Sequence, residues 1–214
     1  SDNLSMKPEP GANSTNSGSL DETAASSRKK ISTIENNRKK PFHIAGIGGS
    51  AGSLEAFEEF FRNMPADSGT AFVLVSHLDP THKALLAELL QRVTAMKVIE
   101  VTDGMKVFPN YVYVIPPNFD MSIMHGALQL LEPSLPRGFR MPIDFFFRQL
   151  ADDQREKSIG IILSGMGTDG TLGLKAIKEK MGLVMVQDKS SAKYDGMPQS
   201  AINTGLADFV APVN

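Results

Sequence analysis

Short apolar runs alternate with amphipathic stretches along the chain from residue 41 onward. Continuous apolar runs such as 71–75 and 159–163 are typical of parallel strands that are covered on both faces. Stretches such as 53–62 instead place apolar side chains at helical spacing. This alternation predicts a doubly wound α/β domain, with a mostly parallel sheet and helices on both faces. The expected strands are 42–47, 71–75, 97–101, 111–115, 159–163, 182–186 and 208–211, and the expected helices are 53–62, 81–90, 142–150, 172–180 and 197–203.

Two local signals refine this pattern. Between residues 106 and 131, two short alternating runs flank His125-Gly126, which predicts an antiparallel β-hairpin. Thr81 precedes an apolar-periodic stretch and is a good candidate for the cap of that helix.

Residues 1–40 differ in composition from the rest of the chain. They contain 16 Ser, Thr or Asn residues, no aromatic residue and no valine. Such a segment buries too little apolar surface to offset its ordering entropy, so we expect a disordered tail or linker. Its basic clusters at 28–30 and 38–40 are interpreted as solvated flanks, although they could contact an acidic surface. Residues 41–214 are the predicted folded domain.

Composition excludes several classes of function. The 214 residues carry a formal net charge of −2 with a pI of about 6.1, which disfavours a nucleic-acid partner. The absence of cysteine excludes disulfides, thiolate nucleophiles and cysteine metal sites. The four histidines are scattered, so neither a metal nor another cofactor is expected. No apolar run approaches the 18 or so residues of a membrane span, which predicts a cytoplasmic protein without membrane insertion.

Polar groups of complementary kinds follow three of the predicted strands. Ser50 follows the first strand, His77 the second, and Asp169 lies in a glycine-rich loop after a later one. In open α/β sheets, sites form outside the carboxyl ends of the strands. A hydroxyl, an imidazole and a carboxylate at one edge are the parts of an acyl-transfer site.

Gly48-Gly49-Ser50-Ala51-Gly52 matches the G-x-S-x-G pattern, in which a tight strand-to-helix turn exposes the serine hydroxyl. Amides at the start of the next helix could stabilise an oxyanion. The alternative is a plain glycine-rich turn capped by serine. The chain order Ser, His, Asp differs from that of the α/β-hydrolases, so the pattern does not predict that fold.

A phosphate-binding interpretation competes for the same residues. Gly46-x-Gly48-x-x-Ala51 fits the dinucleotide fingerprint G-x-G-x-x-G/A. That fingerprint requires an acidic residue about 20 residues further on, at the end of the second strand. Ser76-His77 stands there, and the nearest acid, Asp79, lies 31 residues beyond Gly48. This weakens the nucleotide-binding alternative without eliminating it.

His77 and Asp169 each have a structural alternative. A strand-end histidine has a pKa suited to a general base, but it could equally form a local hydrogen bond. Asp169 could orient that histidine, or it could cap the following helix. Their joint placement with Ser50 favours catalysis. The other histidines, His43, His82 and His125, are assigned to surface or structural positions.

Six short motifs together resemble the CheB-type chemotaxis protein-glutamate methylesterase domain over about residues 42–212. The resemblance implies a doubly wound α/β domain with an antiparallel hairpin, and a serine hydrolase that removes methyl groups from glutamate γ-methyl esters of chemoreceptors. Many members also deamidate receptor glutamines. The motifs are Ile47-Gly48-Gly49-Ser50-Ala51-Gly52-Ser53, Val75-Ser76-His77, Asp103-Gly104-Met105, Val112-Tyr113-Val114-Ile115-Pro116-Pro117, the run 162–170 (ILSGMGTDG) and the run 196–202 (GMPQSAI).

The resemblance implies a role for individual residues. The family nucleophile falls on Ser50, its base on His77 and its acid on Asp169. Met166 matches a methionine whose amide is thought to help the oxyanion hole, with an amide near Ala51 as the second donor; otherwise Met166 packs over the sheet edge. Tyr194 and Arg148 could line the cleft, or have packing and surface roles.

The chain departs from the usual family pattern in its nucleophile loop, which reads Ser50-Ala51-Gly52-Ser53 instead of Ser-Thr-Gly-Gly. The sequences of residues 142–147 and 192–198 are closer to those of family members fused to methyltransferase and sensory kinase modules. We therefore expect a fragment of a larger signalling protein. Its expected partners are those modules and the methylated cytoplasmic helices of chemoreceptors. The alternative function is a catalytically silent regulatory binding module.

Overall fold

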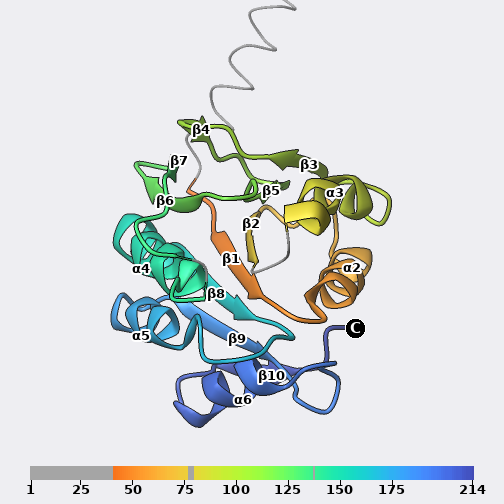
Figure 1. Cartoon of the computed structure of the whole chain (residues 1–214), viewed down its shortest axis with the longest axis vertical. Coiled ribbons are helices and arrows are strands. Elements are labelled where there is room, and N and C mark those ends of the chain that lie inside the picture. Colours follow the sequence, from red (N-terminus) through yellow and green to blue (C-terminus); the bar gives the residue numbers. More distant parts are fainter. Residues whose placement is uncertain (1–40, 77–79, 137) are drawn as a thin grey trace, which may run out of the picture. The chain divides into compact units, whose positions relative to one another are not determined.

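The computed structural model describes residues 41–76, 80–136 and 138–214, and for residues 80–84 it describes the backbone alone. Residues Phe42–Asn214 form one compact unit. At its centre is a seven-stranded sheet in the order β10-β9-β8-β1-β2-β5-β3, and every neighbouring pair is parallel (Figure 1). Its strands are β1 (Ile44–Gly49), β2 (Ala71–Ser76), β3 (Lys97–Glu100), β5 (Tyr111–Val114), β8 (Ser158–Ile162), β9 (Leu183–Gln187) and β10 (Phe209–Ala211).

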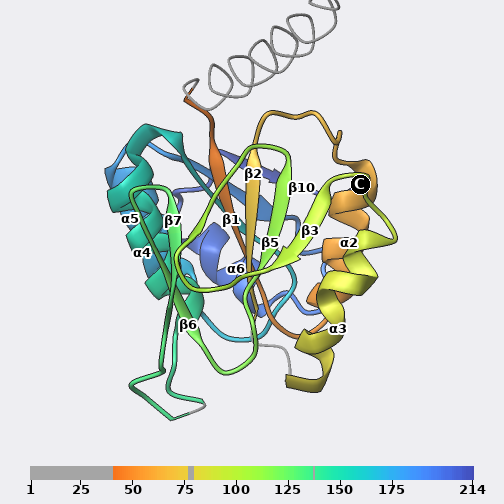
Figure 2. The ribbon, with the colours of Figure 1, turned by 90° about the horizontal axis from the view of Figure 1, so that it is seen from above.

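Helices cover both faces of this sheet, as predicted. Helices α2 and α3 lie on one side, while α4 and α5 lie on the other (Figure 2). No helix in the described ranges is long and apolar enough to cross a membrane. The helices are α2 (Ser53–Asn63), α3 (Pro80–Gln91), α4 (Pro142–Gln154), α5 (Thr171–Glu179) and α6 (Gly196–Asn203), with a 3-10 turn η1 at Arg155–Lys157.

The two faces of the sheet are buried by alternate residues of the same strands. Ile44 and Val73 belong to a core that includes Phe146 and other residues of α4, α5 and α6. Ile47, three residues after Ile44 and so on the other face of the strand, belongs to the opposite core with Phe57 of α2. Because side chains alternate along a strand, a strand buried on both faces must be apolar throughout. This explains the continuous apolar runs of the sequence.

A separate antiparallel sheet in the order β4-β7-β6 packs beside α4. The predicted hairpin is present: β6 (Asp120–Met124) and β7 (Ala127–Leu131) pair around His125-Gly126. Both turn residues have positive φ, 51° and 70°, as a two-residue type I′ turn requires. The third strand, β4 (Met105–Lys106), was not expected from the sequence.

Helix α4 extends four residues beyond its expected end at Leu150, and two other sequence-based boundaries need correction. The first strand begins at Ile44 and continues to Gly49, two residues further than expected. Helix α3 begins at Pro80, so Thr81 lies inside its first turn and is not its cap. Proline suits this position because the first amide of a helix has no partner within the helix.

The strand order reverses between β1 and β8. From β1 the chain moves to β2 on one side, and β8 later adds on the other side of β1. The connection after β1 leads to α2 on one face of the sheet, whereas the connection after β8 leads to α5 on the opposite face. In open α/β sheets, the carboxyl edge at such a reversal of strand order is where ligands bind.

Candidate active site

The loop after β1 forms the tight turn that the sequence predicts. Ser50 follows the last residue of β1, and its carbonyl oxygen accepts a hydrogen bond from the Ser53 amide at 3.0 Å. Gly52 caps α2 with φ 67°, in the left-handed region that favours glycine. A Cβ atom at Gly52 would lie 2.9 Å from Lys193 and Tyr194 atoms. Glycine is therefore required here both for the backbone conformation and for close packing.

The loop after β8 lies directly against the Ser50 turn. The Ser50 amide donates to the Ser164 carbonyl oxygen at 3.0 Å. A Cβ atom on Gly165 would lie 2.9 Å from Cβ of Ser50, so only glycine fits at this contact. The structure thus brings together the two loops that contain the predicted nucleophile and the predicted acid.

Asp169 is buried in this second loop, with 5% of its surface exposed. Its Oδ2 accepts from the Ile143 amide at 3.0 Å and its Oδ1 from the Asp144 amide at 2.8 Å. Asp169 therefore caps α4 rather than the following helix, which corrects the structural alternative suggested by the sequence. The cap of α5 is Gly170, with φ 95° and no side-chain hydrogen bond.

Asp144 is a second buried acid at this position, and the sequence analysis gave it no role. Its Oδ1 accepts from the Gly173 amide in the first turn of α5 at 2.6 Å. Burial raises the pKa of Asp144, and the nearby charge of Asp169 raises it further, while the Gly173 hydrogen bond opposes both. The sequence does carry a signal for Asp144, because it is an acid at the third position of a helix that begins at Pro142. An acid at this position is common, since it can cap its own helix.

Met166 and Ala51 lie in the two apposed loops. The Met166 side chain is 61% exposed, so it does not pack over the sheet edge as the alternative supposed. Ala51 is half-buried, and its carbonyl oxygen accepts from the Ser164 hydroxyl. Both residues therefore flank the contact between the Ser50 turn and the loop after β8.

His77 lies outside the described residues, so its relation to Ser50 and Asp169 is a prediction. The described part of β2 ends at Ser76, which is paired in register with Gly49. The side chain of His82 is also outside the described part. His43 and His125 are exposed, and the amide of His125, in the hairpin turn, donates to Asp153 of α4, so both agree with surface or structural positions.

The glycines of the competing dinucleotide fingerprint are used for packing. Gly46 and Gly48 lie within β1, and neither is in the loop. A Cβ atom on Gly46 would lie 2.8 Å from the Phe147 ring, and one on Gly48 would lie 2.5 Å from Ile143. These glycines allow α4 to approach the sheet closely and are covered by its side chains. The nucleotide-binding interpretation is therefore wrong.

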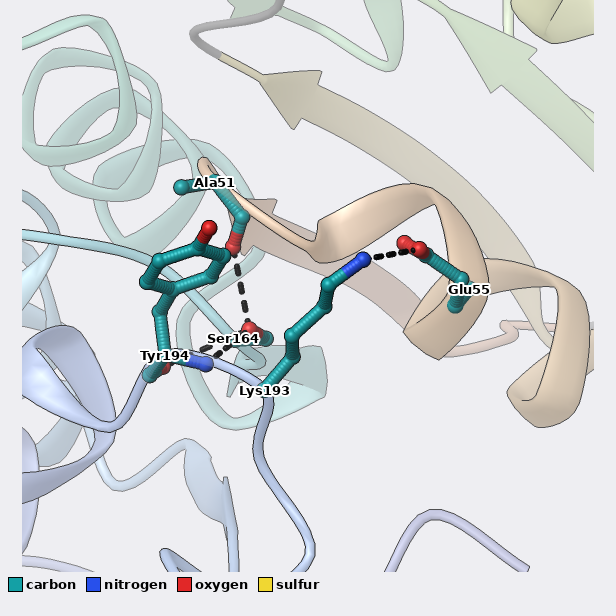
Figure 3. A network of polar contacts seen from close by, with 5 residues as sticks. All are labelled: Ala51, Glu55, Ser164, Lys193 and Tyr194. Atoms are coloured by element: carbon teal, nitrogen blue, oxygen red, sulfur yellow. Dashed lines mark hydrogen bonds and ion pairs between the residues drawn. The ribbon is translucent and has the colours of Figure 1, made fainter.

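The loop after β9 is a third neighbour of the Ser50 turn (Figure 3). The Gly165 amide donates to the Tyr194 carbonyl oxygen at 2.9 Å, and Lys193 pairs with Glu55 of α2 at 2.5 Å. This hydrogen-bonded ion pair lowers the pKa of Glu55 and raises that of Lys193. Tyr194 thus lies beside the turn, which is compatible with either role considered for it, whereas Arg148 is exposed on α4.

The described residues contain no cluster of three or more His, Asp or Glu side chains able to hold a metal ion. At this edge the described residues supply a serine hydroxyl, two buried carboxylates and the backbone amides of three loops.

Comparison with known proteins identifies the family. A family model described as CheB methylesterase matches residues 45–214. The chain belongs to the CheB methylesterase family. Its fold agrees with this: the crystal structure of the CheB methylesterase catalytic domain of Thermotoga maritima superposes with a TM-score of 0.75 at 32% identity, covering 80% of this chain and 93% of that one.

Two curated relatives of this CheB family domain are enzymes of the same name. The protein-glutamate methylesterase/protein-glutamine glutaminase 1 of Carboxydothermus hydrogenoformans is 31% identical, over 86% of this chain and 61% of that protein. The protein-glutamate methylesterase/protein-glutamine glutaminase of Moorella thermoacetica is 32% identical, over 82% of this chain and 43% of that protein. The chain thus spans roughly half the length of these relatives.

Proposed function

We propose that this chain is a serine carboxylesterase that hydrolyses glutamate γ-methyl esters of chemoreceptors. The observation that carries the proposal is the apposition of the Ser50 turn and the Asp169 loop at the switch point of the sheet, in a chain of the CheB methylesterase family. The names of the relatives supply the reaction, demethylation of protein glutamate and deamidation of protein glutamine, and the resemblance to the CheB family supplies the chemoreceptors.

In the first half of the reaction, the Ser50 hydroxyl attacks the ester carbonyl carbon while His77 takes its proton. Asp169 holds the imidazole and stabilises its positive charge. Amides near Ala51 and Met166 stabilise the oxyanion, and the loss of one such donor typically lowers kcat about 100- to 1000-fold. The tetrahedral intermediate collapses, the carbon–oxygen bond to the methoxy group breaks, and His77 returns the proton so that methanol leaves.

In the second half, water attacks the glutamyl-enzyme ester. His77 again takes a proton, the bond to Ser50 breaks, and Ser50 regains its proton as the receptor glutamate is released as a carboxylate. The same steps on a glutamine side chain release ammonia, which is deamidation. Neither reaction requires a metal ion or another cofactor.

The remaining proposals concern the bounds of the domain, its substrate and its partners. We assign residues 41–214 to the catalytic domain, and residues 1–40 lie outside it. The substrates are methylated cytoplasmic helices of chemoreceptors, so the enzyme acts in the cytoplasm. The further partners are the methyltransferase and sensory kinase modules of a larger fusion protein.

Methanol release from a methylated receptor fragment tests the proposal. Ser50→Ala is expected to abolish release while circular dichroism and the thermal midpoint remain those of the wild type. Met181→Ala serves as a matched control, because Met181 is exposed and lies beyond the end of α5. Near-full activity of Ser50→Ala would eliminate the assignment.

A silent regulatory module is distinguished in the same experiment. Saturable binding of the receptor fragment by the wild type without any methanol release would favour that alternative. A rise of activity with pH through one ionisation near neutrality is expected from a histidine base, whereas a flat profile from pH 5 to 8 would contradict it.

A further inference from the structure

Ser164 connects the three loops that follow β1, β8 and β9 (Figure 3). Its backbone oxygen accepts from the Ser50 amide at 3.0 Å. Its hydroxyl lies 3.0 Å from the Ala51 carbonyl oxygen, to which it donates, and 3.3 Å from that of Tyr194. The same hydroxyl accepts from the Tyr194 amide at 3.0 Å. One fully buried side chain therefore joins the nucleophile turn to the loop after β9.

The position of Ser164 is itself fixed by Gln187, a buried residue at the end of β9. The Ser164 amide donates to Gln187 Oε1 at 2.8 Å. The other end of that amide group, Nε2, donates to the Ser191 carbonyl oxygen at 3.1 Å. Because each of these polar groups has a partner, the network has one preferred arrangement and resists movement of any single loop.

We propose that Ser164 is a positioning residue for the nucleophile Ser50. Its hydroxyl holds the carbonyl of the peptide group that joins Ala51 to Gly52, one residue beyond Ser50, while its carbonyl holds the Ser50 amide. Together these two bonds fix the turn that presents the Ser50 hydroxyl and the adjacent amide of Ala51. The inference rests on the proposed function, since it assumes that Ser50 is acylated.

Loss of the Ser164 hydroxyl is expected to weaken stabilisation of the transition state more than it weakens substrate binding. Without the Ser164 hydroxyl, the Ala51 carbonyl and the Tyr194 amide lose partners in a half-buried region. The turn can then shift, and a misplacement of about 1 Å is enough to lower the rate about 100-fold. The outer surface that meets a receptor helix is unchanged. We therefore expect kcat to fall while KM stays nearly constant.

The test compares hydroxyl deletions in the full chain, using kcat and KM for methanol release from a methylated receptor fragment. Ser164→Ala is expected to lower kcat about 10- to 100-fold with KM within about 2-fold of the wild type. Ser164→Thr keeps the hydroxyl and is expected to restore most of kcat. Ser191→Ala removes a hydroxyl from the exposed rim of the same network and is expected to leave kcat unchanged.

Ser164→Cys provides a second measure if the alanine variant does not fold, since it keeps the side-chain shape and a weak donor while weakening the hydrogen bonds of the hydroxyl. It is expected to give an intermediate kcat. The positioning role is overturned, and the proposed function stands, if Ser50→Ala is inactive while a folded Ser164→Ala or Ser164→Cys variant has the kcat of the wild type. An active Ser50→Ala overturns the proposed function, and with it this inference.

Discussion

Asp144 and Asp169 cap each other's helices. Asp169, two residues before α5, accepts from two amides in the first turn of α4, and Asp144, in that first turn, accepts from the Gly173 amide of α5. Carboxylates at helix N-termini are favoured by the unpaired amides and by the helix dipole. The reciprocal arrangement fixes the loop that contains the predicted catalytic acid against the helix that covers the sheet.

Removal of the Asp144 carboxylate is expected to destabilise the fold. Asp144→Ala leaves the Gly173 amide without its acceptor in a buried environment, which costs about 1–3 kcal/mol. Asp144→Asn retains an acceptor oxygen and is expected to cost less. Urea unfolding at pH 7 measures both. Equal stability of Asp144→Ala and the wild type would show that the cap contributes nothing.

The pH dependence of stability is expected to distinguish the charge of Asp144 from its hydrogen bond. Its pKa in the folded state is raised above the ordinary value of 3.8, chiefly by burial. The folded state therefore holds this proton more tightly than the unfolded state, and stability contributed by the protonated form is lost as pH rises from about 4 through the folded pKa.

Asp144→Asn does not titrate, so its stability relative to the wild type should improve as pH rises through this window. Urea titrations at several pH values between 3.5 and 7 measure the difference. A difference that stays constant with pH, or changes in the opposite direction, would contradict the raised pKa.

Gly173→Ala is expected to destabilise the protein although alanine is the better helix former. Alanine gains about 1 kcal/mol of helix propensity over glycine. A Cβ atom at Gly173, however, would lie 2.5 Å from Cβ of Phe147 and 3.2 Å from Cα of Asp144. Neither atom is the end of a flexible side chain, so α4 and α5 must separate. Overpacking typically costs about 1–3 kcal/mol, and we expect a net loss of about 1 kcal/mol or more.

The matched control for this variant is Lys175→Ala, an exposed position on the same helix, which should change stability by less than about 0.5 kcal/mol. Thermal and urea unfolding measure both variants. Stabilisation by Gly173→Ala would show that the two helices do not meet as closely as described.

Two buried serines are expected to respond to alanine with opposite signs. The Ser53 hydroxyl, at the start of α2, is buried without a hydrogen-bond partner in the described part of the chain. Ser53→Ala should therefore stabilise the protein by up to about 1 kcal/mol, because it removes an unpaired polar group and improves helix propensity. Ser158, equally buried, donates its hydroxyl to the Arg155 carbonyl oxygen, so Ser158→Ala should destabilise by about 1 kcal/mol. Thermal melts decide the sign.

The parallel sheet and its helices could be predicted from local patterns. Apolar runs such as 71–75 and 159–163 correspond to strands buried on both faces, and His125-Gly126 indicated the hairpin through its turn chemistry. Strand β4 has only two residues and carries no periodic signal, so it was missed. The residue type of Thr81 suits a helix cap, but Pro80 determines the start of α3.

The candidate site was predictable only in part, since its residues meet through long-range contacts. Ser50 and Asp169 were found because each follows a predicted strand. The capping of α4 by Asp169 spans 25 or 26 positions, and the bond from Ser164 to Ala51 spans 113. No local pattern reports such pairings. They become visible only once the order of β1, β8 and β9 in the sheet is known.

The central claim is that Ser50 is the nucleophile. The most direct test is to label the protein with a serine-reactive fluorophosphonate and to measure the product by mass spectrometry. Aliquots taken during labelling are measured both for the extent of modification and for methanol release from a methylated receptor fragment. We expect one phosphonyl group per chain, on the peptide that contains Ser50, and a loss of activity in proportion to its formation. Full activity with Ser50 completely modified, or loss of activity without modification of Ser50, would contradict the account.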